Sequence, residues 1–173
     1  MKNRFAAAAF CAALALTACS SPTTEGGLLA TKSPTQLLRN EAANRLLTGT
    51  DDSVGAQQDY SAACKSEAED PGGLYRSWRS TLLAEVPEDS AIGVDQFVGA
   101  LATSFSEDGW VFTEAHDGAA GKVTTMTRTD SIVTMTFTSN EDTGDGASVY
   151  IEASGPCVLT GGPDSDEVTS LEN

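Results

Sequence analysis

The chain has 173 residues, and its 25 acidic side chains against 10 lysines and arginines give a formal net charge of −15 at pH 7. A surface with this charge repels phosphate backbones, so nucleic acid is excluded as an expected partner. The length corresponds to one domain. The sequence contains one histidine and no Cys-x-x-Cys pair, so we expect no metal site and no cofactor.

Residues 1–18 have the features of an export signal. Lys2 and Arg4 form a positive start, and an uninterrupted apolar run follows over residues 5–16. That run of about twelve residues suits a signal peptide, whereas a membrane-spanning helix needs about 20.

An aliphatic residue and two small ones, Leu16, Thr17 and Ala18, then precede Cys19. This segment resembles the lipobox of bacterial lipoproteins. The resemblance implies that a diacylglyceryl group is attached to the Cys19 thiol and that a signal peptidase cuts after Ala18. Two acyl chains would then hold the protein on the membrane. The alternative is an ordinary secretory signal in which the cysteine occurs by chance.

On this interpretation the protein lies at the extracytoplasmic face of the bacterial cell membrane, which it contacts through the lipid on Cys19. Residues 19–32 are expected to form the lipidated cysteine and a flexible tether, because they are rich in Ser, Thr, Gly and Pro. Residues 33–160 are expected to form a single domain, and residues 161–173 an acidic, disordered tail.

Two cysteines remain once Cys11 leaves with the signal and Cys19 carries lipid. They are Cys64 and Cys157. A lone pair of cysteines in an exported domain most often forms a disulfide, and closing so long a loop restricts the unfolded chain. The alternative, a reactive or metal-binding pair, would need further ligands at close spacing, which the sequence lacks. A Cys64–Cys157 disulfide is therefore predicted.

Two segments have helical periodicity. Ser33 is expected to cap the first, with Pro34 in its first turn and Gln36 completing a capping box, and Gly49 ends it. Its apolar stripe comprises Leu38, Ala42, Ala43, Leu46 and Leu47. The second helix has the stripe Val94, Phe97, Val98, Leu101 and Phe105, and Gly109 follows its end.

Alternation of apolar and polar residues predicts the strands. They fall at 59–65, 74–86, 110–115, 122–129, 131–139 and 147–154, with Asp130 forming a tight hairpin turn. The residues expected to face the core are Trp78, Leu82, Ala84, Val86, Val133, Met135, Phe137, Val149, Ile151 and Ala153. Hairpin-linked strands favour an α+β fold: an antiparallel sheet of about five or six strands, in the order α-β-β-α-β-β-β, with two helices packed on one face.

Several of these features occur together: the lipobox, Cys64 at the end of the first strand, Trp78 on a long strand, Gly109-Trp110 after the second helix, and a closing Gly155-Pro156-Cys157-Val158. In this combination the chain resembles the small secreted lipoproteins of actinobacteria, which have a paired-cysteine α+β domain and largely lack an assigned activity. The resemblance covers most of the chain, and its motifs are structural. It implies the fold and the disulfide rather than a reaction.

The candidate catalytic residues are His116 and Asp117, the pair that a Ser-His-Asp site would use. No Gly-x-Ser-x-Gly elbow accompanies them, and a histidine at the end of a strand is more often simply solvated, so no catalytic residue is assigned. Residues 140–146 have the composition of a calcium loop, but their glycines fall at the wrong positions, which favours a hairpin turn. Residues 67–73 are interpreted as a solvated turn.

Arg76 and Arg79 interleave with Tyr75 and Trp78. This grouping suits an anion or a sugar ring, but alternation in a strand more often separates core from surface, so packing is favoured.

Three classes of function remain open. The first is a lipid-anchored binding or accessory module that meets an envelope protein or another envelope component. The second is a carrier of a small apolar or lipid ligand, and the third is an envelope hydrolase. Because no catalytic signature is present, the first class is favoured and enzymatic activity is not expected.

The lipobox interpretation makes Cys19→Ser a decisive variant. Serine offers no thiol to accept the diacylglyceryl group, so we expect lipid incorporation and processing to be lost. Metabolic labelling with a clickable fatty acid measures this. Equal labelling of the wild type and the variant would contradict the interpretation.

Overall fold

The computed structural model describes residues 27–47, 54–86, 92–118, 121–140 and 146–172. The expected export signal, the lipobox-like segment with Cys19 and most of the expected tether lie outside these residues. So does most of the segment 140–146, which has the composition of a calcium loop.

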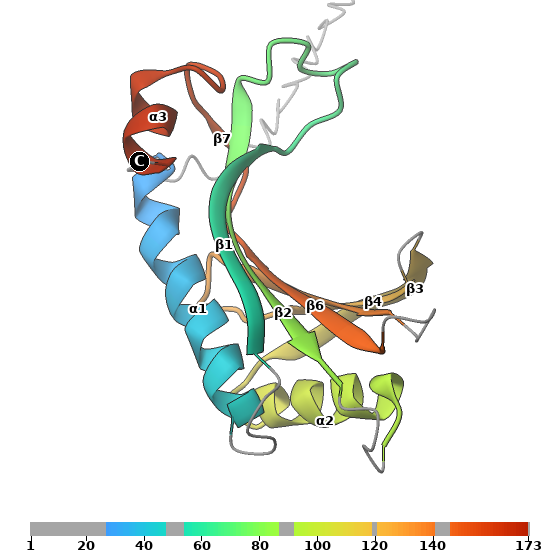
Figure 1. Ribbon diagram of the computed structural model, residues 1–173. Helices are drawn as coiled ribbons and strands as arrows, with labels where there is room; N and C mark the ends of the chain where they lie inside the picture. The colour runs from blue at the N-terminus through green and yellow to red at the C-terminus, as the bar shows by residue number, and fades with distance from the viewer. Residues whose placement is uncertain (1–26, 48–53, 87–91, 119–120, 141–145, 173) are drawn as a thin grey trace, which may run out of the picture.

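The described chain forms an α+β fold with one antiparallel sheet. Its elements are α1 Leu29–Leu47, β1 Val54–Ala63, β2 Tyr75–Glu85, α2 Val94–Ser106, β3 Val111–Gly118, β4 Gly121–Thr127, β5 Thr134–Asn140, β6 Ser148–Ser154, β7 Val158–Leu159 and α3 Asp166–Glu172. The strand order is β1-β2-β6-β5-β4-β3, and β7 pairs with β2. The sheet is strongly curved, and α1 and α2 lie along its convex side (Figure 1).

The fold class is confirmed, but the expected element order is wrong in its details. The described residues form seven strands and three helices. The two elements that were not expected, β7 and α3, both follow Pro156. The turn around Asp130 is also longer than predicted: β4 ends at Thr127 and β5 begins at Thr134. Ser131 donates its backbone N–H to the carbonyl of Arg128, so a turn of its own occupies this connection.

The first helix begins four residues before the expected cap at Ser33, within the segment assigned to the tether. Leu28 is fully buried, and its backbone N–H donates to Oε1 of Glu167 at 2.8 Å. The Thr31 hydroxyl donates to the Leu28 carbonyl. A carboxylate distant in sequence thus satisfies a backbone donor beside the helix start, which local capping rules do not anticipate.

The C-terminal residues are folded, contrary to the expected disordered tail. Helix α3 buries Val168 completely, and Val168 packs with Leu28, Trp78 and Val158 in a small apolar cluster. Glu172 at the end of α3 accepts a hydrogen bond from the Ser61 backbone N–H of β1. The acidic composition suggested disorder, but two apolar residues three positions apart, Val168 and Leu171, give this short helix a side to bury.

The main core lies between the sheet and the helices α1 and α2. The expected stripes are confirmed for the side chains that the structure describes. The buried members are Leu38, Ala42, Ala43 and Leu46 of α1, Val94, Val98, Leu101 and Phe105 of α2, and Leu82, Ala84, Met126, Met135, Phe137, Val149, Ile151 and Ala153 of the sheet. Both helices therefore cover the same face.

A polar contact fixes α1 against the edge of the sheet. Arg39 of α1 is buried and pairs with Asp59 of β1 at 2.8 Å. Asp59 also accepts the Ser80 hydroxyl at 2.5 Å. Burial alone would raise the pKa of Asp59, but the hydrogen bonds from Ser80 and Arg39 and the charge of Arg39 outweigh it and lower the pKa. The carboxylate therefore stays charged and holds the helix in register with β1 and β2.

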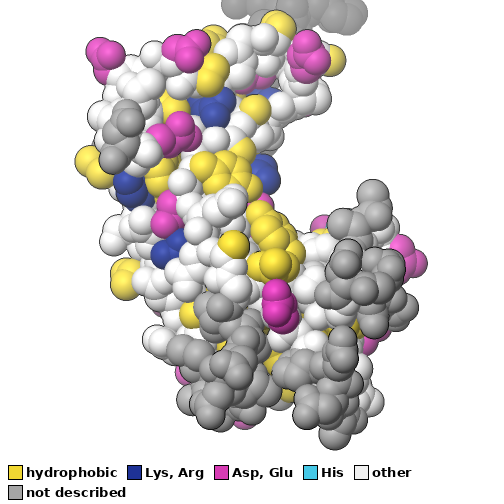
Figure 2. Space-filling model, in the orientation of Figure 1, with side chains coloured by type: hydrophobic (Ala, Val, Ile, Leu, Met, Phe, Trp, Pro, Cys, Tyr) yellow, Lys and Arg dark blue, Asp and Glu magenta, His cyan; other side chains and the backbone are white. Residues whose placement is uncertain are grey.

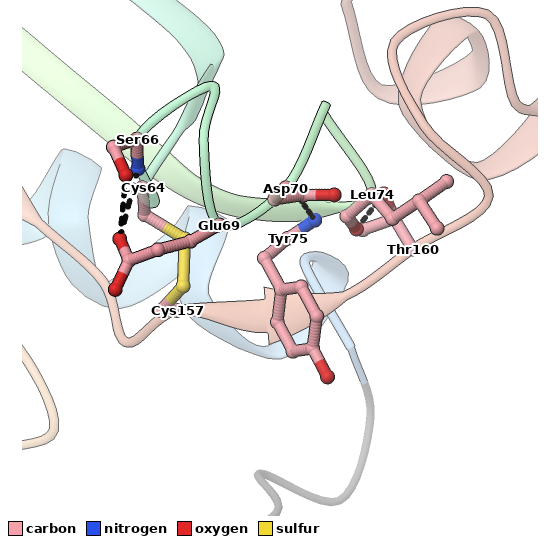
Figure 3. Close-up of a disulfide and its surroundings, with 8 residues drawn as sticks. All are labelled: Cys64, Ser66, Glu69, Asp70, Leu74, Tyr75, Cys157 and Thr160. Atoms are coloured by element: carbon pink, nitrogen blue, oxygen red, sulfur yellow. Dashed lines mark hydrogen bonds between the residues drawn. A yellow bond between two sulfur atoms is a disulfide. The ribbon is translucent and has the colours of Figure 1, made fainter. Parts of the chain in front are cut away.

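The predicted disulfide joins Cys64 to Cys157, with their Cα atoms 5.8 Å apart. Cys64 follows β1, Cys157 precedes β7, and both strands hydrogen bond to β2. The neighbouring turn is less solvated than expected, because Asp70 is buried and accepts the Tyr75 backbone N–H at the start of β2 (Figure 3). The bridge and this carboxylate together fix the end of the sheet that α3 covers.

The burial of Leu101 in the core gives a stability prediction. Leu101 is 6% exposed, so Leu101→Ala removes packed methyl groups and leaves a cavity. We expect it to lower the free energy of unfolding by about 2–5 kcal/mol. The exposed Gln96 on the same helix is the control, and Gln96→Ala should change it by less than about 0.5 kcal/mol. Urea denaturation measures both, and equal midpoints for Leu101→Ala and the wild type would contradict the packing.

Candidate functional site

The candidate site is the sheet face that the helices leave open. Successive strand residues point to opposite faces, so the neighbours of the core residues face away from the helices. We call this surface the concave face; its central residues are Tyr60, Arg79, Thr81, Tyr150, Glu152, Thr134, Thr136, Thr138 and Thr125. The molecule is hollowed on this side, and hydrophobic-class side chains, which include tyrosine, and basic side chains lie on the wall of the hollow (Figure 2).

Two tyrosines meet on the concave face. Tyr60 of β1 and Tyr150 of β6 bring their hydroxyl oxygens to 3.4 Å from one another. Their side chains meet above β2, the strand between β1 and β6, and Thr81 of β2 is only 2% exposed. Burial, the Tyr60 hydroxyl and the charge of Glu152 raise the pKa of Tyr150 to about 12, against the opposing effect of the Thr81 hydroxyl. Tyr150 thus remains a neutral phenol over the ordinary pH range.

An ion pair lies beside the tyrosines. Arg79 is opposite Tyr60 in the register of β1 and β2, and its Nη1 is 3.3 Å from Oε2 of Glu152. The other carboxylate oxygen of Glu152 accepts the Ser154 hydroxyl at 2.7 Å. The Nε atom of Arg79 is buried and has no hydrogen-bond partner within the described part of the chain. Strands β2 and β6 thus present a positioned donor and acceptor pair next to the rings of Tyr60 and Tyr150.

Threonines occupy the strand next to this cluster. Thr134, Thr136 and Thr138 of β5 alternate with the buried Met135 and Phe137. This confirms the predicted facing of that strand. Because the threonines lie opposite Ser154, Glu152 and Tyr150 in the β5–β6 register, the concave face carries hydroxyl groups on adjacent strands.

The structure separates the residues considered for catalysis. His116 and Asp117 are consecutive on β3, so their side chains point to opposite faces. The carboxylate nearest His116 is that of Glu114, with Nδ1 and Oε1 3.3 Å apart, and both side chains are largely exposed. Asp117 lies opposite Lys122 in the β3–β4 register. A Ser-His-Asp arrangement through Asp117 is therefore not assembled.

The interleaved residues of β2 also divide between the faces. Trp78 is fully buried towards the helices, and Arg76 on the same face donates to the hydroxyl and carbonyl oxygens of Ser61. Tyr75 and Arg79 occupy the opposite face. Packing, the favoured interpretation, is confirmed for Trp78 and Arg76, whereas Arg79 belongs to the concave face.

Sequence reasoning did not single out Tyr60, Tyr150 or Glu152. The alternation of β6 places Tyr150 and Glu152 together on the face opposite Val149, Ile151 and Ala153, which are all buried. That alternation was the available signal for their exposure. Their meeting with Tyr60 and Arg79 depends on β6 pairing with β2, a neighbour distant in sequence.

Two hollows lined by described residues lie on the helix side. One of about 340 Å³ is lined by Leu37, Trp110 and Ile132 between α1 and the β4–β5 connection. The other, of about 310 Å³, is lined by Val98, Phe112 and Thr124 between α2 and the outer strands. These volumes are at the lower end for small-molecule sites, which run from about 300 to 1,000 Å³. Leu37 and Phe112 are more than half exposed, so neither hollow is sealed.

Within the described ranges, no group of three or more histidine, cysteine, aspartate or glutamate side chains is arranged to hold a metal ion. No helix in the same ranges is long and apolar enough to cross a membrane.

Comparison with known proteins gives no relative: no protein-family model, no curated protein and no solved structure matches the chain. The function is therefore inferred from geometry.

The raised pKa of Tyr150 predicts a measurable titration. A phenol whose pKa is raised in the folded state contributes stability that is complete below pH 10 and is lost as pH rises towards about 12. We expect one tyrosine to ionise near pH 12 in a phenolate absorbance titration, and its signal to be missing in Tyr150→Phe. The stability of the wild type relative to this variant should fall between pH 10 and 12. A Tyr150 signal centred at pH 10 would contradict the arrangement.

Proposed function

We propose that this chain is a lipid-anchored binding module at the extracytoplasmic face of a bacterial membrane, and that the concave face is its binding surface. The single observation that carries the proposal is the one-sided covering of the sheet. Helices α1 and α2 bury one face (Figure 1). The other face carries two tyrosines, a positioned ion pair and a row of threonine hydroxyls, and the molecule is hollowed on this side (Figure 2).

The side chains of this face suit binding better than packing. Tyr150 is 37% exposed, and Arg79 keeps 30% of its side chain accessible. Tyrosine and arginine are the residues that most often dominate the free energy of binding at interfaces, because each combines a large contact area with directional hydrogen bonds. Their placement on strands gives the surface a fixed geometry, so little ordering is needed when a partner binds.

The anchor proposal is compatible with the place of the domain in the chain. Seven residues lie between Cys19 and Gly27, the first described residue, and so short a segment extends at most about 30 Å. Lipid on Cys19 would therefore keep the domain close to the membrane surface, where its partners would be other components of the envelope.

The carrier and hydrolase alternatives have less support. A carrier needs a cavity that encloses most of its ligand, and the two hollows described above on the helix side are open to solvent. A hydrolase of the glycosidase type needs two carboxyl groups about 5–10 Å apart across a cleft. Glu114 is the carboxylate to replace in testing this alternative, because it lies beside His116 at the rim of the concave face.

Site-specific photocrosslinking in the native bacterium tests the binding surface. A benzophenone side chain at Thr138, on the concave face, should give covalent adducts with an envelope component. The same probe at the exposed Gln96 of α2 should give none, because α2 lies on the other side of the sheet.

Adducts from both positions, or from Gln96 alone, would contradict the assignment of the surface. Hydrolysis of envelope material by the purified chain, with this activity lost in Glu114→Gln, would contradict the binding module and support the hydrolase.

A further inference from the structure

The two tyrosines form an aromatic patch in a surface that is otherwise rich in hydroxyls. Their rings come from β1 and β6, and the contact of their hydroxyl groups across β2 fixes them relative to each other. Exposed aromatic rings of this kind provide flat apolar areas with a negatively polarised face. The C–H groups on one side of a pyranose ring are weakly positive and match such a surface.

The neighbouring polar groups match the hydroxyls of a sugar. Two adjacent hydroxyls on a pyranose ring together donate and accept hydrogen bonds, so they need both a donor and an acceptor at fixed separation. Arg79 and Glu152 supply these groups 3.3 Å apart, and Ser154 orients the carboxylate. Thr136 lies opposite Glu152 in the β5–β6 register and adds a hydroxyl that can donate or accept a hydrogen bond.

The charges of the chain favour a neutral partner over an anionic one. The whole chain carries −15, which repels polyanions. At the centre of the concave face the cation Arg79 is already paired with Glu152, so an anionic chain would gain little there. A lipid surface would need a broad apolar area, and threonines occupy that place instead.

The shape of the surface suits a chain rather than a single small molecule. The sheet order places five inter-strand steps between β1 and β3, which at about 4.8 Å each span about 24 Å. That length accommodates several linked sugar rings, and the hollow is open at its side (Figure 2).

We propose that the concave face binds a neutral polysaccharide, with sugar rings against Tyr60 and Tyr150 and sugar hydroxyls bonded to Arg79, Glu152 and the threonines of β5. This inference rests on the proposed binding function and names the class of its partner.

Affinity electrophoresis of the purified full-length chain in a mild detergent tests the inference. Native gels would contain dextran, amylose, galactomannan or arabinogalactan as neutral polysaccharides, and polygalacturonate as the anionic comparison. We expect at least one neutral polymer to retard the chain. An increase of about tenfold in salt concentration should leave the retardation unchanged, because a neutral polymer has no net charge whose attraction salt could screen. Tyr60→Ala and Tyr150→Ala should each weaken the apparent affinity by about tenfold.

Matched variants separate a lost contact from a lost fold. Tyr150→Phe keeps the ring and should stay within about twofold of the wild type, and Phe112→Ala removes an exposed ring on the helix side and should have no effect. Glu152→Gln keeps the shape of the acceptor without its charge and should weaken binding, which provides a test if Tyr150→Ala does not fold.

The inference is overturned if no neutral polymer retards the chain, if polygalacturonate retards it more strongly, or if both tyrosine variants bind like the wild type. Should crosslinks from Thr138 then lead to a protein, the proposed binding function stands and only the polysaccharide is wrong. Should Thr138 give no adduct at all, the binding function itself fails.

Discussion

Strand β2 imposes the constraint on which the rest of the structure depends. Its residues Trp78, Leu82 and Ala84 are buried completely on the helix side. Because a strand alternates its faces, this burial necessarily turns Arg79 and Thr81 to the opposite side. A shift of one residue in register would move an indole into the concave face and a guanidinium into the core, at a cost of several kcal/mol. The core therefore fixes the orientation of the binding surface.

Different elements hold the two ends of the curved sheet. At one end, α3, β7 and the Cys64–Cys157 bridge gather around Trp78. Towards the other end, α2 covers β5 and β6 through Phe105 and Leu101. Helix α1 connects these regions, and its Arg39–Asp59 pair attaches it to the edge strand. The covered side is thus the outside of the curve, and the open side is its hollow (Figure 1).

The fold was largely predictable where the signal is a local period. The α2 stripe, the alternation of β5 and β6 and the long strand β2 all follow from apolar residues at spacings of 3.6 or 2. The disulfide was predictable because only two cysteines remain if Cys11 leaves with the expected signal and Cys19 carries the expected lipid. The start of α1 and the existence of α3 could not be predicted from the sequence. Each depends on the other through Glu167 and the Leu28–Val168 cluster. Local composition cannot report a contact between residues 139 positions apart.

The candidate site was less predictable than the fold for the same reason. Tyr60 and Tyr150 lie 90 positions apart. Taken alone, each is an ordinary tyrosine in a strand and gives no sign of a site. The β1–β2 pairing places Tyr60 beside Arg79, and the β2–β6 pairing adds Tyr150 and Glu152.

This dependence also explains why the motif-based candidates were uninformative. His116 and Asp117 are adjacent in sequence, and that adjacency on a strand is what directs them to opposite faces. In an antiparallel sheet of this kind, residues that act together are those opposite or diagonal to one another on neighbouring strands, whatever their separation in the chain. A site on the concave face must therefore be identified from register, and register in turn is set by the apolar residues on the side that it does not use.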